Sequence, residues 1–64
     1  MYSVTIRKQG ASRWYYFTTT PAGGITGHAK TQWDCEQLAI QHIPSGKEYD
    51  LTIDGANRGQ QVKP

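Results

Sequence analysis

Four consecutive aromatic residues, Trp14 to Phe17, constrain the fold of this chain more than any other feature. Three threonines follow them, and this density of aromatic and β-branched residues predicts a strand from Arg13 to Thr20. Successive side chains of a strand point to opposite faces, so two of the four rings must lie on each face. Only one pair can be covered in a core on one side of a small sheet. The other pair must lie on an open face or in an interface.

The segments around this strand carry further strand signals. From Tyr2 to Lys8, and again from Glu48 to Asp54, apolar and polar side chains alternate as a half-buried strand requires. The turn-forming segment from Pro21 to Gly24 separates the aromatic strand from residues 25–29, which can form another strand even though Gly27 weakens it. Asp54-Gly55 is a strong turn signal. The chain therefore contains four predicted strands.

One helix is predicted between the third and fourth strands. Thr31, followed three residues later by Asp34, has the pattern of an N-cap with an acidic residue in the first turn, so the helix should begin near Gln32. Pro44 should close it after about three turns. The residues expected on its inner side are Cys35, Leu38, Ala39, His42 and Ile43.

These elements predict an α+β domain in which one amphipathic helix packs on one face of a small antiparallel sheet, in the order β-β-β-α-β. The domain should span residues 1–55. For residues 56–64 a flexible tail is the preferred interpretation, and a short edge strand is the alternative. Either Tyr15 and Phe17 lie under the helix, which leaves Trp14 and Tyr16 on the open face, or the reverse holds.

Length and composition limit the number of domains and indicate the compartment in which the protein functions. At 64 residues the chain has room for one domain, and no apolar run approaches the about 20 residues needed to cross a bilayer. We expect a soluble, cytoplasmic protein without a membrane partner. The single cysteine, Cys35, cannot form an internal disulfide, which fits a reducing compartment.

The charges are distributed unevenly along the chain. Residues 1–33 contain four basic and no acidic residues, whereas residues 34–64 contain five acidic and three basic residues. Aromatic platforms edged by cations stack bases and hold phosphates. We therefore predict a nucleic-acid-binding module without catalytic activity. Its expected contact residues are Arg7, Lys8, Arg13 and Lys30 for phosphates, and Trp14, Tyr15 or Tyr16 for bases or sugars.

An alternative interpretation is that the same residues bind a protein instead of nucleic acid. Trp, Tyr and Arg are also enriched at protein interfaces, so the aromatics could form the core of a homodimer or the contact surface of a protein-binding regulator or inhibitor. Metal and catalytic sites are not expected. Cys35, His42 and His28 lack the spacing of a zinc site, and neither histidine adjoins a recognisable nucleophile motif. No cofactor is predicted, because Gly23, Gly24 and Gly27 lack the spacing of a nucleotide-binding loop.

A resemblance to a known family covers about residues 2–43. The residues that carry it are Arg13 to Phe17, Gly23, Gly24, Thr31, Cys35 and Ala39. This stretch resembles the three-strand-plus-helix N-terminal domains of phage-type integrases, and small uncharacterised bacterial and phage domains of the same order. The resemblance implies that the sheet enters the major groove of DNA, with Arg7, Arg13 and Tyr15 or Tyr16 as contacts.

The resemblance also implies a small accessory protein of phage or prophage type, and such proteins often bind and block a host protein. Two features depart from the integrase pattern. The chain contains no integrase catalytic domain, and a fourth predicted strand with an acidic outer face, Glu48 to Asp54, follows the helix.

Overall fold

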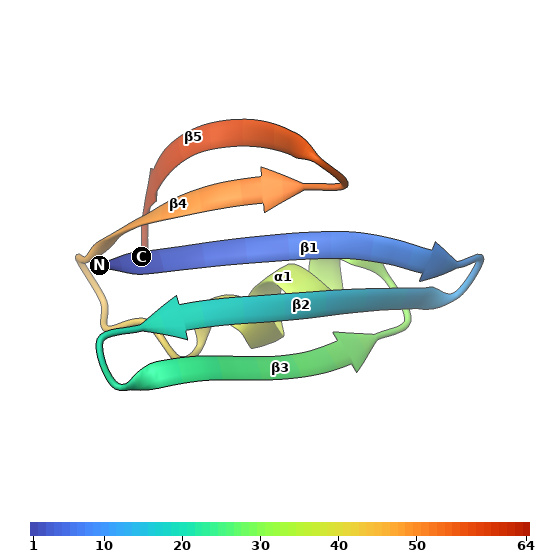
Figure 1. Cartoon of the computed structure of the whole chain (residues 1–64), viewed down its shortest axis with the longest axis horizontal. Coiled ribbons are helices and arrows are strands. Elements are labelled where there is room, and N and C mark those ends of the chain that lie inside the picture. Colours follow the sequence, from blue (N-terminus) through green and yellow to red (C-terminus); the bar gives the residue numbers. More distant parts are fainter.

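The computed structural model describes all 64 residues, which form one helix and a five-stranded sheet. The elements in chain order are β1 (Tyr2–Gly10), β2 (Arg13–Thr20), β3 (Gly23–Ala29), α1 (Gln32–Ile40), β4 (Glu48–Ile53) and β5 (Ala56–Val62). Across the sheet the strands run in the order β3-β2-β1-β4-β5 (Figure 1). The first strand of the chain is therefore the central strand of the sheet.

The α+β class and the single helix on one face are confirmed, but the sheet is mixed instead of antiparallel. Strand β4 pairs with β1 in parallel, and the other three pairings are antiparallel. A parallel neighbour requires a crossover connection, and α1 provides it between β3 and β4. Alternating side chains predict a strand and its two faces but not the direction of its neighbour, so the sequence pattern did not reveal this pairing.

Residues 56–62 form a full edge strand of the sheet, so the preferred interpretation, a flexible tail, is wrong and the alternative is correct. The domain therefore extends past the predicted boundary at residue 55. The turn that leads into the edge strand is the predicted Asp54-Gly55, and both residues have positive φ, 52° and 87°. A two-residue hairpin turn of this kind matches the twist of the flanking strands and favours Asp-Gly. Beyond the strand, Lys63 Nζ donates to the carbonyl oxygens of Ile40 and Ile43, both at 2.9 Å.

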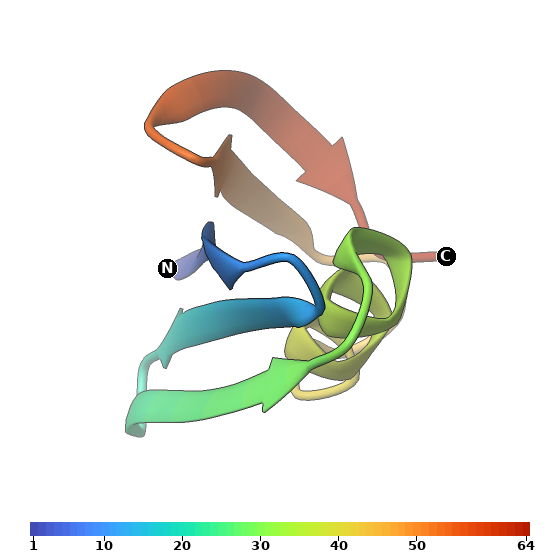
Figure 2. The same cartoon turned by 90° about the vertical axis from the view of Figure 1, so that its right-hand side faces the viewer.

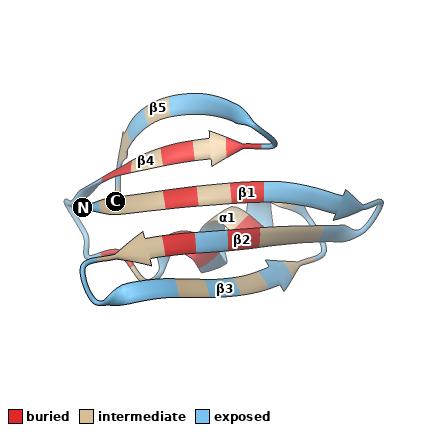
Figure 3. Cartoon of the chain, viewed as in Figure 1, coloured by how far each residue is buried: buried red, intermediate tan, exposed pale blue.

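The core lies between the sheet and α1, which covers a single face (Figure 2). Burial is concentrated in the middle of β1, β2 and β4, whereas the edge strands β3 and β5 contain no buried residue (Figure 3). The buried apolar residues are Val4, Ile6, Tyr16, Cys35, Ala39, Ile40, Ile43, Tyr49, Leu51 and Ile53.

The helix begins where the sequence predicts and ends one turn early. The Asp34 N–H donates to Thr31 Oγ1 at 3.1 Å, which confirms the N-cap. The helix ends at Ile40, and the Ile43 N–H donates to the Ile40 carbonyl oxygen in a tighter turn. Leu38, expected on the inner side, is 37% exposed, because Cys35 and Ala39 together with the residues next to the helix end occupy the space against the sheet.

One buried hydroxyl connects the helix to the sheet. Thr18 is fully buried on β2, and its Oγ1 donates to the Ala39 carbonyl oxygen at 2.9 Å. This carbonyl lies in the last turn of α1, where helix carbonyls lack an intrahelical partner. The hydrogen bond therefore satisfies two buried polar groups and fixes the end of the helix over β2.

Candidate nucleic-acid interface

The face of β1, β2 and β3 opposite the helix carries cationic and aromatic side chains in register. Tyr15 on β2 lies between Arg7 on β1 and His28 on β3. In the next row, Phe17 lies between Thr5 and Thr26. We call the surface formed by Arg7, Gln9, Arg13, Tyr15, Phe17 and His28 the basic face. These six residues alternate with the side chains that point toward the helix.

The strand register decides which aromatic pair is covered. Tyr16 is buried at 7% exposure and Trp14 is half-buried, both on the helix side. Tyr15 is half-buried, and Phe17 is 41% exposed on the opposite side. Of the two arrangements left open by the alternation, the structure therefore has the one with Tyr15 and Phe17 on the open face.

Small residues on β3 explain this choice. Tyr16 pairs with Gly27 across β2 and β3, and a Cβ atom on Gly27 would lie 2.5 Å from the Tyr16 hydroxyl oxygen. Trp14 pairs with Ala29 in the same way. The helix side of β3 thus leaves room for the two large rings of β2 to lie across it. This pattern of small residues is the signal in the sequence that could have identified the buried pair.

A shallow hollow of about 370 Å³ opens at one end of the basic face. Its walls are Gln9, Arg13, Tyr15 and His28. The guanidinium of Arg13 and the amide of Gln9 supply hydrogen-bond donors, and the ring of Tyr15 supplies a stacking surface. Donors beside an exposed ring are the combination that holds a phosphate next to a base.

The seven residues predicted as contacts do not all lie on one surface. Arg7, Arg13 and Tyr15 belong to the basic face. Trp14 and Tyr16 face the helix, as does Lys8, whose Nζ lies 5.9 Å from the centre of the Trp14 ring. Lys30 is exposed in the link between β3 and α1.

Three members of the basic face, Gln9, Phe17 and His28, were not among the predicted contact residues. His28 belongs to it because it pairs with Tyr15 across the β2–β3 hairpin. Counting outward from the turn at Pro21 to Gly24 along both strands would have placed His28 opposite Tyr15. Gln9 joins the face as the last outward residue of β1.

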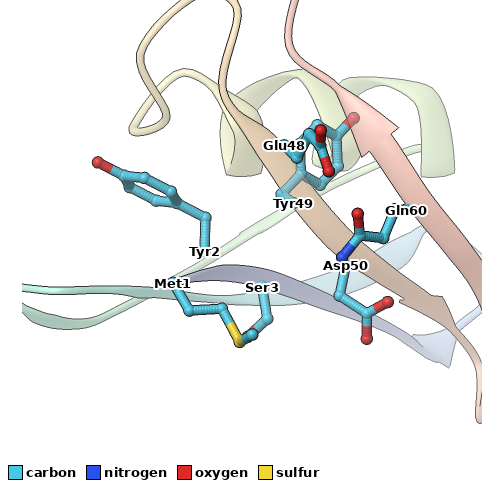
Figure 4. Close-up of a pocket in the computed structure, with 7 residues that line it drawn as sticks. All are labelled: Met1, Tyr2, Ser3, Glu48, Tyr49, Asp50 and Gln60. Carbon is cyan, nitrogen blue, oxygen red and sulfur yellow. The ribbon is translucent and has the colours of Figure 1, made fainter.

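The far end of the same sheet face is acidic, so the face is electrostatically polarised. Ser3 pairs with Asp50, and Asp50 pairs with Gln60. Figure 4 shows this region, where the Ser3 and Asp50 side chains point to one side of the sheet and Tyr2 to the other. The Asp50 carboxylate accepts a hydrogen bond from Asn57 Nδ2 at 3.2 Å. Ser3 is four residues from Arg7 along β1, which places the acidic end roughly 13 Å from the basic row.

The cysteine and the histidines do not form a joint site. Cys35 is fully buried, and its pKa is raised by burial first and by the nearby Glu36 carboxylate second. The His42 ring lies 6.4 Å from the Tyr16 ring on the helix side, whereas His28 is on the opposite face. No cluster of three or more His, Cys, Asp or Glu side chains is arranged to hold a metal ion. The helix is too short and too polar to cross a bilayer.

Comparison with known proteins adds no further constraint. No protein family, characterised protein or solved structure matches this chain.

Proposed function

We propose that this protein is a non-catalytic module that binds nucleic acid through its basic face. The observation that supports the proposal is the row of Arg7, Tyr15 and His28 across three strands, on the side that the helix leaves open. No acidic residue occurs in β1, β2 or β3. Cations beside exposed rings attract the phosphate backbone and stack bases with little dependence on sequence.

Two rings on one strand face are suited to neighbouring nucleotides. Tyr15 and Phe17 are two residues apart on β2, so their Cα atoms are roughly 6.6 Å apart. In this arrangement the rings contact bases or sugars, and Arg7, next to Tyr15 on β1, and Arg13, two residues before it on β2, contact phosphates. The resemblance of residues 2–43 to integrase N-terminal domains makes duplex DNA the first ligand to test, and a phage or prophage accessory protein the corresponding role.

Fluorescence anisotropy with labelled duplex DNA, single-stranded DNA and RNA tests the proposal. Binding should be measurable at low salt and should weaken steeply as salt is added, because counterions are released from the phosphates. Arg13→Ala should reduce the salt slope by about one and weaken binding to all sequences alike. Tyr15→Ala should lower affinity roughly fivefold to a hundredfold through the loss of stacking, whereas Tyr15→Phe should retain it.

A matched control separates this surface from a general effect of charge. Arg58 is an exposed arginine on β5, at the other edge of the sheet, and Arg58→Ala removes the same charge as Arg13→Ala. Arg58→Ala should change affinity less than twofold. Absence of binding to all three ligands at low salt, or equal losses in the two arginine variants, would refute the proposal.

The second candidate is a regulator that binds another protein through the same surface, and the exposed Phe17 ring favours it. Phe17 is 41% exposed and lies between two threonines, without a cation next to it in its row. An exposed ring next to Tyr15, with Arg13 further along the same strand face, has the composition of an interface hot spot. In that case Phe17→Ala should abolish capture of a protein partner, and Arg13→Ala should mainly change the dissociation rate.

A further inference from the structure

The two edges of the sheet differ in how well they are protected against pairing. Strand β5 is interrupted by a bulge, since Leu51 pairs with Gly59 and Thr52 with Asn57, which leaves the charged Arg58 as the extra residue. Bulges and charges are the usual protection of an edge strand. Strand β3 has no such protection. It pairs with β2 at all seven of its positions without a register shift, and it contains no Lys, Arg, Asp, Glu or Pro.

We propose that β3 pairs antiparallel with β3 of a second copy of this chain, about a twofold axis that is perpendicular to the sheet and passes midway between the two Thr26 residues. Side chains alternate between faces, so this axis keeps both helices on one side and both basic faces on the other. All seven residues of the strand are then paired, with Gly23 opposite Ala29 of the second copy at each end. The paired edge shares His28 with the basic face, but the proposal does not depend on nucleic-acid binding.

Side-chain size supports this register. Thr26 lies opposite Thr26 of the second copy, which is a favourable cross-strand pair. Ile25 lies opposite Gly27 of the second copy, and His28 lies opposite Gly24. Each of the two large side chains of the strand therefore meets a glycine, and no two large side chains compete for the same space.

The rings of β2 extend this complementarity. A Cβ atom on Gly24 would lie 2.7 Å from the Phe17 ring, so this ring covers Gly24 on the open face. His28 of the second copy would lie next to the Phe17 ring. On the helix side the Tyr16 ring covers Gly27, and Ile25 of the second copy would lie next to that ring. Pairing would thus cover part of the exposed Phe17 surface.

The assembly would be one continuous ten-stranded sheet in which each copy contributes five strands. Three strand spacings separate Phe17 of one copy from Phe17 of the other, which is roughly 14 Å. The two basic faces would then form one surface with twofold symmetry. Like charges at Thr26 of the two copies would oppose this assembly.

Sedimentation equilibrium without nucleic acid, over a range of protein concentrations, tests the proposal. The wild type should change with concentration from a mass of 7.2 kDa to about twice that value. Thr26→Lys and Thr26→Glu each place like charges opposite one another, so each should weaken association roughly fivefold or more. An equimolar mixture of the two variants should recover dimers, because opposite charges then face each other.

Gln60→Lys is the matched control, since it adds the same charge to an exposed, outward position of the other edge strand. It should leave the association constant unchanged. A wild type that is monomeric up to about 1 mM would overturn the proposal and leave this edge to an extended peptide of another protein. Equal effects of Thr26→Lys and Gln60→Lys, or no recovery in the mixture, would also overturn it.

Discussion

Replacing Lys63 by methionine should destabilise the protein more than any other change to a charged residue of the C-terminal strand and tail. The Lys63 ammonium donates to the carbonyl oxygens of Ile40 and Ile43, each at 2.9 Å, where α1 ends and the chain turns away. A cation at this position also interacts favourably with the helix dipole. The same residue is held by its backbone, because its N–H donates to Lys47 and its carbonyl accepts from Gly46.

The expected decrease in the free energy of unfolding follows from these contacts. A hydrogen bond from a charged group contributes about 1.5–3 kcal/mol when buried, but Lys63 is half-exposed, so each bond should contribute nearer about 1 kcal/mol. Lys63→Met retains most of the aliphatic side chain and removes both bonds, for a loss of about 2 kcal/mol. In a domain of 64 residues this corresponds to a decrease in Tm of roughly 8–16 °C.

Thermal and urea unfolding, followed by circular dichroism, measure this loss. Lys47→Met is the control, because Lys47 is an exposed lysine of the same hairpin region and should change stability by less than about 0.5 kcal/mol. The two variants lose the same charge, so long-range electrostatics cancel in the comparison. Equal stabilities of the two variants would show that the Lys63 contacts do not hold the end of the helix.

Two further changes test the packing of the aromatic strand and the environment of the cysteine. Gly27→Ala should lower the free energy of unfolding by about 1–3 kcal/mol, because its Cβ would lie 2.5 Å from the hydroxyl oxygen of the buried Tyr16. Gly24→Ala should stay within about 1 kcal/mol of wild type, because the exposed Phe17 ring can move away. Similar urea midpoints for the two variants would contradict this reasoning. Burial first and Glu36 second raise the pKa of Cys35, so the folded state holds this proton more tightly than the unfolded chain does. The free energy of unfolding should therefore decline as pH rises above about 8.5, iodoacetamide should react only after unfolding, and Cys35→Ala should reduce the decline.

Much of the meander and the helix start could be predicted from local patterns. Alternation located β1 and β4, the aromatic and threonine run located β2, and Thr31 with Asp34 located the start of α1. These features depend on neighbours within a few residues in sequence. The existence of one open sheet face followed from there being a single helix, and Figure 2 shows that face uncovered.

The features that were not predicted depend on contacts between distant segments. The choice between Tyr15 and Tyr16 as the buried ring is made by Gly27 on the neighbouring strand. Strand β5 has little apolar surface of its own, since Val62 is its only large apolar residue and is exposed. It is held by backbone pairing with β4 and by the contacts of Lys63, neither of which leaves a hydrophobic pattern in the sequence.

The position of β1 has a consequence for how the molecule forms. One side of this strand pairs with β2, which follows after a short turn. Its other side pairs with Tyr49 to Ile53 of β4, which can reach it only after the helix between them has been synthesised. Loop closure over most of the chain costs entropy before any of these contacts is gained. We expect this docking to be the rate-limiting event of folding. The hairpins on either side can form earlier, and the polypeptide becomes one cooperative unit only when its beginning and its last third meet.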